Sequence, residues 1–461
     1  MMPVDRSQLP GVSDEVAFVF PHIAHHRLEN GVAVRTVEHH SAPVVTVVLM
    51  VEGGAGSDPA GEDGLNALTA DMADEGTGVM SALDVSDALA RIGADYDVEV
   101  GPDATIFTLT TLSRFALRGA SLLADIVTRP ALTASDFERV RQLRLDRLRQ
   151  LKDLAPATAE RTFLRLLYGQ HPYGHLAIGN EASLGKLTLE QVSQWHSAAY
   201  RPDRTTIVVA GPLGHRQLAE FASEAFGSWE SASRHDGESS VPAAEVPVPA
   251  RPSTRLAIVP REGAAQSELR IGHLSARRST PDYPALLVMN AVMGGQFVSR
   301  VNLKLREEKG FTYGARTGFD WRRGPAPFVL QASVHTAATA EAIQDSLREL
   351  EDIRSARPAT ESELALAKAS LTRGYPRNFE TGQQVARSVA QLALFNLPDT
   401  YFEEFVPKVR AVTVGDVTRA AANYLDPQAS TTLIVGDHAA IADSLASIGL
   451  GEPDVLPRSL D

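Results

Sequence analysis

The sequence predicts an α+β protein of two similar domains, and three observations lead to this prediction. At 461 residues, the chain is too long for one ordinary hydrophobic core. The segment 187–211, LTLEQVSQWHSAAYRPDRTTIVVAG, is echoed by 412–437, VTVGDVTRAAANYLDPQASTTLIVGD. A Pro-, Ser- and Ala-rich stretch at 233–253 lies between the two copies and is typical of an extended linker. We therefore expect domains at 20–232 and 254–447.

The repeated segment has the same predicted structure in both copies. The alignment pairs Thr188 with Thr413, Val192 with Val417, Tyr200 with Tyr424, and Pro202 with Pro427. Each copy reads as a helix capped by threonine, a proline turn and a buried strand of β-branched residues. So many matches in register indicate two domains of one kind.

The remaining elements follow from periodicity and turn residues. In the first domain, strands before long helices favour α+β layers. We predict two strands in 31–54, helices at 65–72 and 81–92, a hairpin at 96–112, and helices at 134–154 and 155–169. In the second domain, we predict a strand at 269–278 and a helix at 283–294.

Composition excludes several classes of function. The formal charge of −13 argues against nucleic acid or an anionic membrane as the main partner, because such binding needs Lys and Arg. Without cysteine, there is no disulfide, thiolate metal site or cysteine nucleophile. No apolar run is long enough to span a membrane, and the first twenty residues lack the pattern of a signal peptide. A cytoplasmic protein is expected, or a periplasmic one if an export signal was trimmed.

The predicted helix at 65–72 looks like the frame of a metal site without its ligands. Leu65, Leu68 and Met72 form one apolar stripe. Positions 67 and 71 lie one turn apart on one face, a spacing at which two histidines can share a zinc ion. Here they are Ala67 and Asp71.

Several motifs together resemble one family. The two α+β halves, the helix after GSDPAGEDGL, the later HPYGH and the second-half LREEKGFTYG resemble the pitrilysin/insulinase-like zinc peptidases, peptidase family M16. The similarity is closest to the short-chain branch that includes the mitochondrial processing peptidase. It implies two homologous metallopeptidase-like (LuxS/MPP-like) domains, each an antiparallel-rich sheet with helices on one side, forming half of a clamshell.

The resemblance also implies where zinc would bind in an active relative. The HxxEH motif of the family falls on Ala67 and Asp71 for the two histidines and on Ala70 for the glutamate base. The third ligand position falls on Arg147. Since a zinc site needs three or four ligands, we expect no metal and no cofactor in this chain.

An ion pair could fill the missing site. Arg147 shares a helical stripe with Val140 and Leu151, which suggests that it points inward. A half-buried guanidinium needs a partner, so we expect Arg147 to pair with Asp71.

The second-half motif keeps its functional residues. Arg306 and Tyr313 match the arginine and tyrosine with which the family binds the substrate backbone and stabilises the tetrahedral intermediate at the zinc site. Both side chains can donate to an oxygen that gains negative charge. The alternative is a solvated charge run at 306–309 with Tyr313 as a half-buried strand residue.

These observations leave three hypotheses for function. The first is a zinc-free subunit of a heterodimeric peptidase, in which Arg306 and Tyr313 serve the zinc-loaded HxxEH site of a partner chain that hydrolyses peptides. The second is an inactive peptide-binding or structural scaffold. The third is an independent hydrolase that uses the histidines at 22–26 and 39–40, although adjacent histidines in a strand point to opposite faces. In active relatives, a strand of the hairpin at 96–112 lies at a sheet edge and takes the substrate as an added strand, so we expect an edge strand here.

Overall fold

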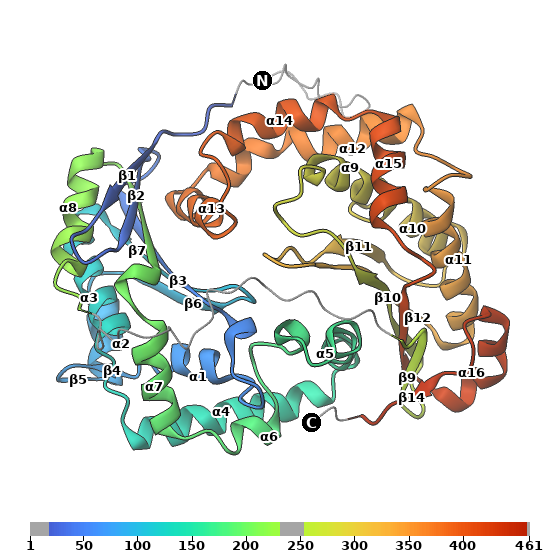
Figure 1. Cartoon of the computed structure of the whole chain (residues 1–461), viewed down its shortest axis with the longest axis horizontal. Helices are drawn as coiled ribbons and strands as arrows, with labels where there is room; N and C mark the ends of the chain where they lie inside the picture. Colours follow the sequence, from blue (N-terminus) through green and yellow to red (C-terminus); the bar gives the residue numbers. More distant parts are fainter. Residues whose placement is uncertain (1–17, 231–252, 459–461) are drawn as a thin grey trace, which may run out of the picture.

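The computed structural model describes residues 18–230 and 253–458. The predicted linker at 233–253, apart from its last residue, lies outside the described residues. Figure 1 shows two sheets on opposite sides of the molecule, with helices arranged around them in a ring. The fold is a mixture of sheets and helices in two halves, which confirms the predicted fold class.

The first sheet has six strands in the order β1-β2-β8-β3-β7-β6. Among its neighbouring strands only β2 and β8 run parallel, so the sheet is mostly antiparallel. Its strands are β1 Ile23–Arg27, β2 Ala33–Glu38, β3 Val44–Glu52, β6 Asp95–Val100, β7 Ala104–Leu112 and β8 Thr205–Gly211. The predicted hairpin is β6–β7, and β6 is an edge strand, as predicted.

The second sheet repeats five strands of this topology. Its order is β11-β12-β10-β13-β9-β14, and the first five strands correspond to β6, β7, β3, β8 and β2 of the first sheet. The sixth strand differs, because β14 follows β13 in the chain and pairs parallel with β9, whereas β1 precedes β2 and pairs antiparallel with it. The parallel pair β13–β9 corresponds to β8–β2, and the edge strand β11 corresponds to β6. The strands are β9 Leu256–Pro260, β10 Gln266–Leu274, β11 Ala315–Phe319, β12 Pro327–His335, β13 Thr431–Gly436 and β14 Asp454–Val455.

The helices follow the expected pattern. In the first half they are α1 Leu65–Asp71, α2 Ala82–Arg91, α3 Ala116–Thr128, α4 Ala134–Lys152, α5 Ala155–Tyr168, α6 Glu181–Leu184, α7 Leu189–Ala199 and α8 His215–Phe226, with the short hairpin β4 Gly76–Thr77 and β5 Met80–Ser81. In the second half they are α9 Tyr283–Met293, α10 Arg300–Asn302, α11 Thr339–Asp352, α12 Glu361–Arg373, α13 Gly382–Leu394, α14 Tyr401–Ala411, α15 Val414–Tyr424 and α16 His438–Leu445. Across the described residues, none of the helices combines the length and apolar character of a membrane span.

Threonine caps fix the repeated helices. Thr188 and Thr413 each accept a hydrogen bond from a backbone N–H of the first turn, and each forms a capping box. Such a cap satisfies an N–H group that has no partner within the helix. The predicted pattern of a capped helix, a turn and a strand is therefore confirmed in α7–β8 and α15–β13.

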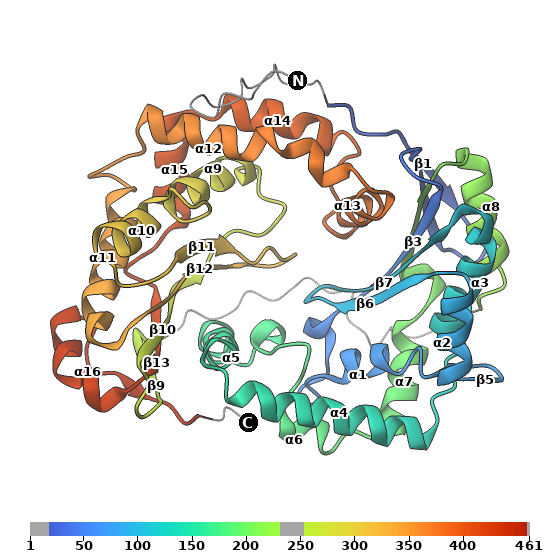
Figure 2. The same cartoon turned by 180° about the vertical axis from the view of Figure 1, so that it is seen from behind.

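Each half also lends one helix to the sheet of the other half. α5 packs on β10 and β13 of the second sheet, and α13 packs on β3 and β8 of the first, as Figures 1 and 2 show. The two helices lie at equivalent places in the repeat, between β7 and β8 and between β12 and β13. Phe163 and Leu167 of α5 share a core with Leu433 and Val435 of β13. The two halves are thus held together by reciprocal burial of apolar side chains.

Candidate functional site

α1 keeps the frame that the sequence predicts. It begins after Gly64, whose φ of 95° lies in the left-handed region that favours glycine. A Cβ at this position would lie only 2.9 Å from the Cα of Gly179, so the close approach also requires glycine. Leu65, Leu68 and Met72 are buried, which confirms the apolar stripe.

The positions of the expected zinc ligands do not suit a metal ion. Ala67, at a ligand position, and Ala70, at the position of the base, are buried and have no atom that could bind a metal or accept a proton. Arg147, at the expected third position, is exposed, and among the described residues its side chain donates a hydrogen bond to Gln150 at 3.4 Å. Within 18–230 and 253–458, no three His, Asp or Glu side chains are grouped so that they could hold a metal ion. These positions therefore do not supply the three or four ligands that a zinc ion needs.

The expected ion pair forms, but with a different arginine. Asp71 accepts a hydrogen bond from Arg144 of α4, which also donates to the carbonyl of Ala177 at 2.9 Å. The prediction that Arg147 would be the partner was wrong. The buried face of α4 carries Phe137, Val140 and Leu148. Arg144 lies four residues before Leu148 on this face, whereas Arg147 is turned away from it by about one residue step of the helix.

The surroundings of Asp71 are acidic and partly buried. Burial, with smaller contributions from the nearby charges of Glu75 and Asp71, raises the pKa of Asp74 to about 6. Burial also raises the pKa of Tyr200, which is 4% exposed, and Asp71 adds to this shift. A carboxylate, a guanidinium and a buried phenol therefore lie close to the position at which the resemblance implies a metal in active relatives.

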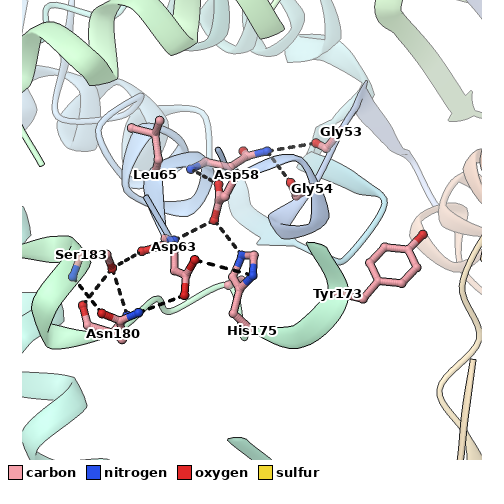
Figure 3. A network of polar contacts seen from close by, with 12 residues as sticks. Gly53, Gly54, Asp58, Asp63, Leu65, Tyr173, His175, Asn180 and Ser183 are labelled. Carbon is pink, nitrogen blue, oxygen red and sulfur yellow. Dashed lines mark hydrogen bonds and ion pairs between the residues drawn. The ribbon is translucent and has the colours of Figure 1, made fainter. Parts of the chain in front are cut away.

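A polar network holds the start of α1 (Figure 3). The buried Asp58 accepts hydrogen bonds from the backbone N–H of Gly64 at 2.7 Å and of Asn66 at 2.8 Å. His175, from the HPYGH motif, lies with its Nε2 atom 3.1 Å from Asp58, and its Nδ1 atom is 3.9 Å from Asp63. The motif thus anchors the helix frame.

Asp58 and His175 form a buried pair in which the pKa values of both groups are raised. Burial raises the pKa of Asp58. Burial alone would lower the pKa of His175, but the hydrogen bond and charge of Asp58 raise it overall. The pair consequently keeps its proton to higher pH than either group would in water.

Arg306 and Tyr313 lie in the second half, near β11. Arg306 is on a π-helical turn, Leu303–Glu308, which continues α10. Its guanidinium lies 4.3 Å from the ring centroid of Phe297 and 3.1 Å from the carboxylate of Glu307. Tyr313 precedes β11 and is 90% exposed, so it is not a half-buried strand residue. Tyr313 and Phe297 line a cavity of about 500 Å³.

The histidine clusters have structural partners. On β1, His25 lies 2.7 Å from Asp399 of the second half, whereas His26 faces Thr36 at 3.4 Å. The two neighbours point to opposite faces, as expected. His22 lies 3.4 Å from His215 at the start of α8.

Two features of the site were missed at the sequence level. The apolar stripe of Phe137, Val140 and Leu148 at helical spacing indicates that Arg144 faces inward, but it does not identify the partner of Arg144. Arg316 lies on β11 between two cavities, and nothing in the sequence around it indicates this position. Its setting depends on strands and helices that are distant in the sequence.

The fold and this site together define a class of protein. The chain combines two halves of closely similar topology, a short helix α1 without a group of metal ligands among the described residues, and an exposed Tyr313 before β11. These features fit a two-domain metallopeptidase fold. Comparison with known proteins identifies the family. Residues 33–178 match the family model described as insulinase (peptidase family M16), and residues 186–371 match the peptidase M16 inactive domain. The chain belongs to peptidase family M16.

Relatives and solved structures agree with this assignment. An uncharacterised zinc protease of Mycobacterium bovis is 26% identical over 372 residues, covering 78% of this chain and 81% of that protein. A probable mitochondrial-processing peptidase subunit beta of Schizosaccharomyces pombe is 27% identical over 203 residues, 44% of each chain. A peptidase M16 inactive domain from Pseudomonas fluorescens matches with a TM-score of 0.83 at 23% identity, covering 90% of this chain and 98% of that chain. A protease from Helicobacter pylori matches with a TM-score of 0.82 at 20% identity, covering 91% and 100%. At these identities the structures show the fold alone.

Proposed function

We propose that this chain is the zinc-free subunit of a heterodimeric metallopeptidase of family M16. In this proposal, Arg306 and Tyr313 reach the HxxEH zinc site of a partner chain. They bind the peptide backbone and stabilise the oxyanion that forms as the peptide bond is hydrolysed. The zinc ion and the general base belong to the partner.

The observation that supports this role is the contrast between the two motifs. The positions matched to the zinc motif hold Ala67 and an Asp71 already paired with a guanidinium, and Ala70 stands at the position of the general base. The motif of the second half contains both Arg306 and Tyr313. Tyr313 is 90% exposed, and no described residue accepts a hydrogen bond from its hydroxyl. A tyrosine that is this exposed can donate to a group outside the chain.

The direct test is reconstitution. We expect this chain alone to cleave no peptide, and we expect turnover when it is mixed with a family member that carries HxxEH. The measurement is cleavage of a fluorogenic peptide by each chain and by the equimolar mixture, with a chelator control. Turnover by the isolated chain, or a mixture no faster than the partner alone, would contradict the proposal.

A peptide-binding or structural scaffold is the second candidate. Exposed apolar side chains gather around the Arg/Tyr motif, which favours protein binding. They are Phe297 at 64% exposure, Val298 at 45% and Leu303 at 45%. A stable complex with the HxxEH partner that leaves its rate unchanged would favour the scaffold.

A further inference from the structure

One face of the second sheet carries a row of polar side chains that crosses three strands. Arg270 of β10 is directly opposite Gln331 of β12, which in turn is opposite Arg316 of β11. Residues in such a row point to the same face. The row therefore places two guanidinium groups on either side of one amide.

The two arginines differ in their partners. Arg270 lies 2.5 Å from the carboxylate of Glu268, and both side chains are more than nine-tenths buried. Glu268 also accepts a hydrogen bond from Ser333. Arg270 is thus neutralised within the sheet.

Arg316 has only a neutral partner. The amide oxygen of Gln331 accepts its hydrogen bonds in the orientation that satisfies both groups. Within the described part of the chain, no carboxylate forms an ion pair with Arg316. The edge strand therefore presents one uncompensated positive charge in an otherwise acidic protein.

Two cavities meet at Arg316. The first, of about 500 Å³, is the one that Tyr313 lines. The second, of about 590 Å³, lies between β11 and α5. Its walls include the apolar Phe163 and Leu164 of α5 and Val329 of β12. A ligand at Arg316 would thus have an apolar pocket beside its charged contact.

The acidic residues of the second cavity leave Arg316 available. Asp320 lies 2.6 Å from Arg322, with which it pairs. Glu160 of α5 is exposed and is not paired with Arg316.

We propose that Arg316 binds a carboxylate presented by a peptide and that an apolar side chain next to this carboxylate occupies the cavity beside α5. A guanidinium can hold a carboxylate through two parallel charge-assisted hydrogen bonds. The carboxylate can be that of an acidic side chain or of the C-terminus, because the chemistry is the same. The inference rests on the proposed function only in taking a peptide as the ligand.

The test measures peptide binding by fluorescence anisotropy with the full chain and no partner. Three labelled decapeptides share one leucine-rich sequence: one has a central glutamate and an amidated C-terminus, one has glutamine and an amidated C-terminus, and one has glutamine and a free C-terminal carboxylate. We expect at least one carboxylate peptide to bind about tenfold more tightly than the amidated glutamine peptide. Which one does so identifies the source of the carboxylate. Equal binding of all three peptides, or binding of none, would overturn the proposal.

Variants of Arg316 separate recognition of the carboxylate from nonspecific peptide binding. Arg316→Gln should remove the preference, and Arg316→Lys should retain part of it because the charge remains. Arg348→Gln on α11 removes another exposed arginine of the same half and should leave the preference intact. A preference that survives Arg316→Gln would contradict the assignment. Since binding is measured without a partner, a preference without turnover in the reconstituted mixture would refute the peptidase role and keep this site.

Discussion

The two halves share one topology but treat their edge strands differently. In the first half, Arg387 of α13 lies 2.7 Å from Asp97 and 3.2 Å from Glu99, both on β6. In the second half, α5 lies at the equivalent place, but a cavity separates it from Arg316 on β11. The same backbone arrangement is therefore tied together by charged pairs on one side and left open on the other. The comparison shows that a few side chains, and not the backbone arrangement, decide whether the space between the helix and the edge strand is closed by ion pairs or left as a cavity.

The two halves also differ at the positions that the resemblance implies for catalysis. In the first half, the positions matched to the zinc motif hold Ala67, Ala70 and an Asp71 paired with Arg144. In the second half, Arg306 is partly buried against Phe297, and Tyr313 is exposed. If this difference is functional, substitutions of Arg306 or Tyr313 in the second half should change only the turnover of the complex. Substitutions at the Asp71–Arg144 pair in the first half should change the free energy of unfolding.

The largest expected effect is that of Tyr313→Phe on the reconstituted complex. The change removes one hydrogen-bond donor and little volume, so folding and partner binding should persist. Turnover should fall by roughly 10²–10³, the usual loss for one oxyanion donor. Steady-state cleavage by the mixture measures this effect. Arg306→Ala should also weaken substrate binding, because it removes a charge-assisted contact.

The matched control for this experiment is Tyr283→Phe, on the buried α9 of the same half. It removes a hydroxyl that lies outside the motif, so turnover should be unchanged. If Tyr313→Phe and Arg306→Ala both keep full activity, the motif is ordinary surface and the scaffold becomes the better description.

The next effect is on stability and concerns Asp71. Asp71→Ala leaves the Arg144 side chain, which is 13% exposed, with only one carbonyl partner. Because Asp71 is itself 37% exposed, water screens the pair. The loss should be about 1–2 kcal/mol in the free energy of unfolding, below the value for a fully buried pair. Urea denaturation measures it.

Arg147→Ala is the matched control, because this arginine is exposed on the same helix. It should change the free energy of unfolding by less than about 0.5 kcal/mol. Equal losses for Asp71→Ala and Arg147→Ala would show that the identified pair does not stabilise the first half.

A pH effect should come from the network below α1. The folded-state pKa of His175 is raised above 6.5, so the protonated pair stabilises the fold below pH 6.5 and this contribution is lost as pH rises through the folded-state pKa. The raised pKa of Asp58 acts in the same direction. Relative to His175→Gln, the wild type should lose at most about 1.4 kcal/mol per pH unit in this range. A difference in stability between the wild type and His175→Gln that stays constant over about two pH units above 6.5 would contradict the raised pKa of His175.

The smallest expected effect is that of Arg387→Gln. Asp97 and Glu99 are more than half exposed, so the two ion pairs should contribute about 0–1 kcal/mol in total. Hydrogen exchange should nevertheless become faster along β6, because the link between α13 and the edge strand is lost. Unchanged exchange would show that apolar packing of α13, and not Arg387, closes this groove.

Much of the fold could be predicted from the sequence because it depends on neighbours within one or two turns. Helical and strand periodicity, threonine caps and the repeated segment identified α7–β8, α15–β13 and the β6–β7 hairpin. The sequence also shows that position 67 offers no metal ligand and position 70 no base, since the alanine side chain has neither.

Contacts between distant segments could not be read in this way. The sequence did not show that Asp71 would pair with Arg144, because a rotation of α4 by a fraction of a turn exchanges one arginine for another. It did not show that α5 and α13 would each cover the opposite sheet, or that Asp58 would meet His175, 117 residues away. The sequence by itself determined the two-domain architecture and the residue types at the positions matched to the zinc motif, because these depend on local pattern and residue type. Only the tertiary structure decided which charges are paired and which remain available, because pairing depends on how whole elements pack against one another.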